Sequence, residues 1–252
     1  MIIDAHCHAG RGVVKGGRCD TPAAIDDYLR RAAAAGIDRT VLFAPFHHDY
    51  RVANRDVARI IRRHPKRFYG FAFVHAVRDR SRMHELVREA VEEHGFRGIK
   101  VHRHDARITR AVCEAARRWS LPVLYDVFGE VATIDTFASA YPDVDFIIPH
   151  LGTFLDHWSV QCAFLDVLTR HANVYTDTSG VRRVDLIEQA VLRAGAEKVV
   201  FGTDSPWLHP GVELQKIRVL EIAPADQRKI VSGNILRLMS ATSHGVSGSP
   251  GR

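Results

Sequence analysis

Two histidines separated by a single residue stand near the start of the chain, in IIDAHCH. Residues two apart in a β-strand point to the same face, so His6 and His8 could reach one metal ion while Cys7 points the opposite way. Asp204 ends another apolar run, KVVFGTD, and its carboxylate could bind a metal ion and accept a proton from metal-bound water. The structural alternative is a helix N-cap, because Pro206 opens the segment that follows. We predict a metal site made of His6, His8 and Asp204.

Polar residues that can bind a metal ion or transfer a proton also end the other apolar runs. They are His47 and His48, His75, Lys100 and His102, Asp126, His150, and Asp177. Random placement would not concentrate such side chains at the ends of short apolar runs. If these runs are parallel strands, the polar residues lie together at the carboxyl ends, where barrel enzymes carry their chemistry.

The elements that must position these residues alternate along the chain. Short runs rich in β-branched residues recur as IIDAH, TVLFA, FYGFAFV, GIKVH, LPVLYD, VDFIIPH, NVYTD and KVVFGTD. Ala- and Arg-rich stretches with helical spacing, such as PAAIDDYLRRAAAAG, separate them. This alternation predicts an α/β fold, a single (β/α)₈ TIM barrel, over residues 1–240. Residues 241–252 are rich in Gly and Ser, and we expect them to form a disordered tail.

The composition is typical of a soluble globular protein with a hydrophobic core. Hydrophobic residues make up 46% of the chain and charged residues 25%. The chain has no run of about 18 apolar residues, and MIIDAHCHAG lacks a basic segment followed by an apolar one, so we expect neither a membrane span nor a secretory signal. The four cysteines form no CxxC pair and no regular framework, which indicates reduced thiols and a cytoplasmic protein.

The net charge of +6 raises the question of nucleic acid binding. In VANRDVARIIRRH the arginines lie opposite Val57, Ile60 and Ile61 at helical spacing, as on a solvated helix face. No cluster of basic and aromatic residues suggests a groove for single strands. We therefore expect a small-molecule substrate, attracted if it is anionic, and neither nucleic acid nor membrane as a partner. The oligomeric state stays open, with a homo-oligomer as one option.

Several motifs in combination resemble the amidohydrolase superfamily, and most of all its small decarboxylase-related branch. They are HCH after the first strand, an Asn-Arg-Asp helix leading into HPKRFYGFAFV, FRGIKVH, IIPHLG, VYTDTSG, FGTDSPW and the closing GNILRLM. The resemblance implies that His6 and His8 match the first-strand metal pair, Asp204 the eighth-strand aspartate and His150 the catalytic histidine of the sixth strand. It also implies hydrolysis of amides, esters or lactones, or decarboxylation of ring and unsaturated acids.

The fifth predicted strand departs from the family pattern. Where the family usually has a metal-ligating histidine, LPVLYD has Asp126, which could itself bind the metal ion or could orient a ligand or pair with an arginine. A lysine at the position of Lys100 is carbamylated and bridges two metal ions in binuclear members. With the fifth-strand histidine missing, we expect Lys100 to remain an amine that pairs with Asp126 or binds substrate. His102 could bind either the metal ion or the substrate.

The sequence therefore predicts a metal-dependent hydrolase. We expect one divalent metal ion, Zn²⁺ first and Mn²⁺ as the alternative, held by His6, His8, Asp204 and Asp126, with Asp204 and His150 as catalytic groups. Lys100, His102 and Arg103 are the predicted substrate-binding residues, and Arg103 is suited to a carboxylate. Two alternatives stay open: metal-assisted, non-oxidative decarboxylation, and a barrel that binds metal or ligand without catalysis. The Gly-rich loop AGRGVVKGGRC is a candidate flexible lid.

Overall fold

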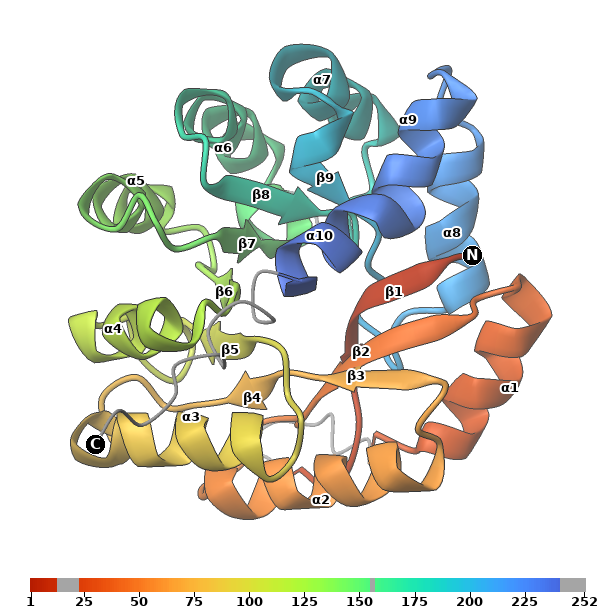
Figure 1. Ribbon diagram of the computed structural model, residues 1–252. Helices are drawn as coiled ribbons and strands as arrows, with labels where there is room; N and C mark the ends of the chain where they lie inside the picture. Colours follow the sequence, from red (N-terminus) through yellow and green to blue (C-terminus); the bar gives the residue numbers. More distant parts are fainter. Residues whose placement is uncertain (13–22, 155–156, 241–252) are drawn as a thin grey trace, which may run out of the picture.

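Strands and helices alternate along the chain and form a closed barrel with an outer ring of helices (Figure 1). The computed structural model describes residues 1–12, 23–154 and 157–240, so the predicted tail and most of the predicted lid loop lie outside the described residues. The strands are β1 (Ile3–His8), β2 (Arg39–Phe43), β3 (Phe68–Gly70), β4 (Ala72–Phe73), β5 (Ile99–His102), β6 (Val123–Asp126), β7 (Phe146–Ile148), β8 (Val174–Asp177) and β9 (Val199–Val200). The helices are α1 (Ile25–Ala35), α2 (Tyr50–Arg63), α3 (Met83–Glu92), α4 (Arg110–Trp119), α5 (Val131–Ala140), α6 (Trp158–Arg170), α7 (Val184–Ala194), α8 (Pro210–Arg218), α9 (Pro224–Arg228) and α10 (Asn234–Ser240).

Backbone hydrogen bonds close the two parallel sheets, β1-β2-β3 and β4 to β9, into one barrel. β3 and β4 are successive parts of a single barrel strand, because the Phe71 N–H donates to Leu42 O and the Ala72 N–H to Gly98 O. At the second seam the Ala5 N–H donates to Phe201 O, which joins β1 to the strand after α7. The described residues thus contain eight barrel strands, and the predicted TIM barrel is confirmed.

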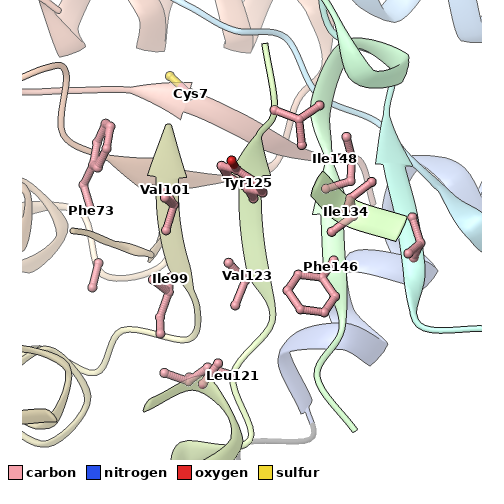
Figure 2. Close-up of a cluster of buried hydrophobic side chains, with 14 of the residues drawn as sticks. Cys7, Phe73, Ile99, Val101, Leu121, Val123, Tyr125, Ile134, Phe146 and Ile148 are labelled. Atoms are coloured by element: carbon pink, nitrogen blue, oxygen red, sulfur yellow. The ribbon is translucent and has the colours of Figure 1, made fainter. Parts of the chain in front are cut away.

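Two hydrophobic layers hold the barrel together. Alternate strand residues such as Leu124 and Ile147 fill the barrel interior, where Leu238 and Met239 of α10 pack against them. Figure 1 shows α10 lying across the ring of strands. The opposite faces of the strands form the larger layer beneath the outer helices, and Figure 2 shows part of it around Tyr125. This packing leaves the polar strand ends at the other end of the barrel from α10.

A β-bulge interrupts β1 between Asp4 and Cys7, around the predicted metal ligand His6. Asp4 pairs with Thr40 and Cys7 with Leu42, so β1 uses one residue more than β2 between these two pairs. Ala5 lies in the interior cluster and Cys7 in the outer layer. Regular alternation would place these two residues on the same face. The extra residue therefore changes which face the following side chains occupy, and it turns His6 and His8 toward the interior.

The arginine-rich segment forms α2, and its charged residues lie as the sequence predicts. Val57 is fully buried, while Arg55, Arg59, Arg62 and Arg63 are exposed. Arg55 pairs with Glu89 of α3 and Arg59 with Asp56. Much of this positive charge is therefore balanced locally. None of the described helices is both long and apolar enough to cross a membrane.

Candidate metal-binding active site

His6, His8 and Asp204 converge at the carboxyl ends of the strands. The Nε2 atoms of both histidines lie 3.4 Å from Asp204 Oδ1. Each residue offers one ligand atom, and the three atoms all lie within 4.8 Å of one another. In the part of the chain that the structure describes, no other group of three such side chains is gathered this closely. Two neutral nitrogens and one carboxylate oxygen form a donor set suited to a divalent ion.

Hydrogen bonds fix both histidines in the tautomer that a metal ion requires. His6 Nδ1 lies 2.7 Å from Asp177 Oδ2, and His8 Nδ1 lies 3.0 Å from the Ala44 carbonyl oxygen. Both partners are acceptors, so each Nδ1 carries the hydrogen and each Nε2 presents its lone pair toward Asp204. Burial lowers the pKa of His6 and brings the pKa of His8 down to about 4. Both imidazoles are therefore neutral near pH 7 and free to bind.

Asp177, at the end of β8, orients the first of these histidines. Its Oδ2 accepts from His6, and its Oδ1 accepts from the Ser179 hydroxyl (2.6 Å) and the Ser179 N–H (3.0 Å). Burial opposes ionisation, but the hydrogen bond from His6, the charge of His150 and the hydrogen bond from Ser179 hold the pKa of Asp177 below its ordinary value. A carboxylate behind a histidine is the usual support of a metal ligand. The sequence predicts only that Asp177 ends a strand at the rim, and that position is the one signal in the sequence for its contact with His6.

The backbone around Asp204 is shaped to bring its carboxylate to the histidines. Asp204 has a φ of +53°, a left-handed conformation that costs a non-glycine residue about 1–2 kcal/mol. Its N–H donates to His6 O (2.8 Å), which ties it to β1 across the seam. Gly202 permits this approach, because a Cβ there would lie 2.9 Å from the Cβ of His6. Strained backbone of this kind gathers at functional sites.

Asp126 lies apart from the three predicted ligands, between two other histidines. Its Oδ2 is 3.0 Å from His102 Nε2 and 3.6 Å from His150 Nε2, and its Oδ1 accepts from the Phe128 N–H. His102 Nδ1 accepts from the His104 N–H, so its Nε2 carries the hydrogen and donates to Asp126. The structure thus does not bring Asp126 or His102 into the His6, His8 and Asp204 group.

His150 is buried and follows β7 in a left-handed conformation, with φ +59°. Its Nδ1 lies 2.7 Å from Ser179 O, so Nε2 is the nitrogen available for chemistry. Burial opposes protonation, but the hydrogen bond and charge of Asp126 prevail and raise the pKa of His150 to about 9. Near pH 7 His150 is therefore an imidazolium that faces Asp126.

Lys100 brings a buried positive charge to the same end of the barrel. Its ammonium nitrogen is fully buried and lies 4.9 Å from the centre of the Phe43 ring. It has no hydrogen-bond partner among the described residues. Burial lowers its pKa, and the charges of Asp126, Asp204 and Asp177 oppose that effect. A buried ammonium without an acceptor is costly unless a bound group completes its hydrogen bonds.

Arg103 has a partner other than substrate. Its guanidinium lies 2.5 Å from Glu130 Oε1, and Arg107 pairs with the same carboxylate. The Arg103 N–H donates to the Asp126 carbonyl oxygen, so its backbone belongs to the rim. The structure therefore places Arg103 beside the site, with its charge already balanced by Glu130.

A family model described as amidohydrolase matches residues 3–239. The chain belongs to this family. A comparison with functionally curated proteins finds no match. Among solved structures, it is similar to 2,6-dihydroxybenzoate decarboxylase from Rhizobium, with 18% identity, a TM-score of 0.75 and coverage of 95% of this chain and 98% of the other. The 5-carboxyvanillate decarboxylase from Sphingomonas paucimobilis gives 15% identity, a TM-score of 0.76 and the same coverage.

A third similar structure is a dihydroxybenzoic acid decarboxylase from Polaromonas sp. JS666, described with bound manganese and the inhibitor 2-nitroresorcinol. It is 18% identical to this chain, with a TM-score of 0.74 and coverage of 95% of this chain and 96% of the other. At such identities, these likenesses show the shared barrel fold.

Aromatic side chains surround the mouth of this amidohydrolase barrel. Phe46 packs against His102, and the Trp207 ring lies 4.6 Å from the ring of His8. Phe128 follows Asp126 and is 59% exposed, and Trp207 is 41% exposed. Exposed aromatic rings beside buried polar groups are typical of sites for small organic ligands.

Proposed function

We propose that this amidohydrolase is a metal-assisted, non-oxidative decarboxylase of a small aromatic carboxylic acid. The observation that carries the proposal is the convergence of His6, His8 and Asp204 at the strand ends that also hold the buried ammonium of Lys100. A site with this donor set and this cation favours an anionic substrate. The aromatic rings of Phe46, Phe128 and Trp207 around the mouth favour a flat one.

The comparisons support this choice over hydrolysis, the activity that the sequence alone favours. The three similar structures reported above are decarboxylases of dihydroxybenzoate or carboxyvanillate, and the resemblance covers nearly the whole length of each. No equally specific observation supports an amide, ester or lactone as the substrate.

His6, His8 and Asp204 are the residues proposed to hold the metal ion. Their fit rests on the two Nε2 lone pairs directed at one carboxylate oxygen and on the hydrogen bonds that fix both rings. Mn²⁺ and Zn²⁺ both accept this mixture of nitrogen and oxygen donors. A bound divalent ion would act as a Lewis acid toward the substrate's oxygens. Asp126 was predicted as a fourth ligand, but its placement with His102 and His150 favours an acid–base role.

Lys100 is proposed to donate hydrogen bonds to the substrate carboxylate, because its buried ammonium has no acceptor among the residues that the structure describes. His102 would orient Asp126 through its hydrogen bond rather than contact the substrate directly. Arg103 would bind the substrate only by breaking its ion pair with Glu130.

His150 is proposed to supply the proton that decarboxylation consumes. When the bond between the ring carbon and the carboxylate breaks, its electron pair stays on the carbon and CO₂ leaves. The carbon then takes a proton from His150 Nε2, and the resulting neutral histidine regains one from solvent. The raised pKa of His150 and its carboxylate partner Asp126 suit it to act as an acid near pH 7.

Hydrolysis stays the second candidate because of Asp204. Burial opposes its ionisation, but the positive charge of His150 lowers the pKa of Asp204. An ionised carboxylate beside neutral histidines could accept a proton from an attacking water.

Product analysis separates the two candidates. Protein purified without chelator is first analysed for its metal content. It is then incubated with 2,6-dihydroxybenzoate, 5-carboxyvanillate and a matched set of aryl esters, lactones and anilides. Released CO₂ and a decarboxylated phenol would support the proposal, whereas a new acid with an alcohol or amine would establish hydrolysis. Bound metal with no turnover on any compound would indicate a barrel that binds without catalysis.

A further inference from the structure

Asp4 is a buried carboxylate that the proposed chemistry does not use, and it lies beside the β1 bulge. It is fully buried. Its Oδ1 accepts from the His6 N–H and the Thr203 N–H, each at 3.0 Å. Its Oδ2 accepts from the Tyr28 hydroxyl (2.8 Å) and the Thr203 hydroxyl (2.6 Å). All the usual acceptor positions of a carboxylate are therefore occupied.

The two N–H groups on Oδ1 belong to the parts of the backbone that carry the predicted metal ligands. His6 is itself one of them, and Thr203 directly precedes Asp204. The His6 N–H lies at the bulge, where its hydrogen bond goes to the side chain of Asp4. A buried N–H without an acceptor is costly, so losing the Asp4 oxygen would favour a rearrangement of the strand.

We propose that Asp4 is a positioning residue whose Oδ1 holds the β1 bulge and the turn at Thr203 together, and thereby sets His6 and Asp204 in place for the metal ion. Without this oxygen, β1 can return to regular alternation. Because Ala5 faces the interior, regular alternation would turn Cys7 inward and His6 toward the helices. The inference concerns the metal ion of the proposed function, but its first test needs no metal.

The chain supplies its own probe for the position of the bulge. Cys7 is fully buried in the outer layer, as is Cys113 on α4. If the bulge is lost, Cys7 reaches the mouth of the barrel and becomes accessible to a small alkylating reagent, while Cys113 stays protected unless the whole fold opens. The alkylation rate of each cysteine under native conditions, read peptide by peptide by mass spectrometry, therefore separates a local change from unfolding.

Three variants test the acceptor itself in the full-length protein. Asp4→Ala removes both oxygens. Asp4→Ser keeps one oxygen, but the shorter side chain cannot bring it within reach of both N–H groups. Asp4→Asn keeps an amide oxygen for the two N–H groups, while the hydroxyl of Tyr28 can turn to Thr40 and that of Thr203 to Ser205. Tyr28→Phe is the matched control, since it removes a bond to Oδ2 and leaves both bonds to Oδ1.

We expect iodoacetamide to alkylate Cys7 at least about tenfold faster in Asp4→Ala than in the wild type, with Cys113 unchanged. Asp4→Asn and Tyr28→Phe should match the wild type. In a parallel titration with Co²⁺, Asp4→Ala should bind about 10–100-fold more weakly and give an altered visible spectrum. If Asp4→Ala does not fold, the same comparison is made with Asp4→Ser.

Wild-type labelling of Cys7 in both Asp4→Ala and Asp4→Ser would overturn the inference. It would also be overturned if Asp4→Asn exposed Cys7 as much as Asp4→Ala, because the charge rather than the acceptor geometry would then matter. Failure of the wild type to bind Co²⁺ would count against the proposed metal ion and leave the labelling result intact.

Discussion

At the scale of single residues, the site is a set of side chains whose orientations are fixed by partners outside the set. His6 depends on Asp177, and His8 depends on the Ala44 carbonyl. The spacing of His6 and His8 was readable from the sequence, because it follows from strand geometry. The identity of their partners was not, because Asp177 and Ala44 are brought there by other strands.

The first prediction concerns the three proposed ligands. His6→Ala or Asp204→Ala should remove bound metal, since either change leaves two donors where at least three hold a divalent ion. Metal per chain, measured by elemental analysis, should fall from about one to near zero. His84→Ala, at an exposed position on α3, is the control and should keep its metal. Full occupancy in both site variants would contradict the ligand assignment.

The second prediction uses the pKa of His150. Asp126→Asn removes the charge that does most to stabilise the imidazolium, so the pKa of His150 should fall from about 9, because burial is then opposed only by the charges of Asp177 and Asp204. His150 would then lose its proton at a lower pH, so the fall of kcat/KM on the alkaline side of the pH profile should also shift to lower pH. Histidine titration by NMR on metal-free protein checks the pKa directly. An unchanged titration would mean that Asp126 does not govern His150.

The third prediction concerns Lys100. If its ammonium binds the substrate carboxylate, Lys100→Met should weaken the binding free energy of the substrate by about 1.5–3 kcal/mol. KM should then rise roughly 10–100-fold. The decarboxylated product lacks the carboxylate and provides the control. Its inhibition constant should be nearly the same for the variant and the wild type. Equal losses for substrate and product would point to a general disturbance of the site.

At the scale of elements, the strand ends determine what the side chains can do. Gly202 leads from β9 into the turn that carries Asp204, and the side chains of His6 and Asp177 lie against it. We predict that Gly202→Ala destabilises the fold by about 1–3 kcal/mol and weakens metal binding, because the added methyl group displaces this pair. Gly36→Ala is the control: Gly36 has a φ of +80° but open space around it, so stability alone should fall. Thermal unfolding and a Co²⁺ titration measure the two effects.

The order of strands and helices was predictable, because the alternation of apolar runs and helical stretches records it directly. The bulge in β1 was not. Strict alternation correctly put His6 and His8 on one face and Cys7 on the other, yet it could not say which face was inside. The extra residue between Asp4 and Cys7 decides which face lies inside the barrel, and this bulge can be recognised only from the pairing of β1 with β2. Likewise Asp126 ends the expected strand, but its two histidine partners come from neighbouring strands.

At the scale of the whole molecule, stability and chemistry occupy opposite ends of the barrel. Leu238 of α10 is buried in the interior cluster, away from the polar strand ends. Leu238→Ala should cost about 2–5 kcal/mol of unfolding free energy through the cavity it leaves. Metal per chain and KM should stay as in the wild type under conditions where the variant is folded. A loss of metal from folded Leu238→Ala would show that the two ends are coupled.

The seam between β1 and the Thr203–Ser205 turn has a consequence for how the protein comes into being. The proposed ligands lie on both sides of that seam, so a growing chain holds the complete set only after Asp204 has been added. During translation His6 and His8 leave the ribosome well before Asp204, so the two histidines lack their carboxylate partner until the last barrel strand has been made. Binding of the ion would then be one of the last steps in maturation, and the ion would link the first and last strands of the barrel.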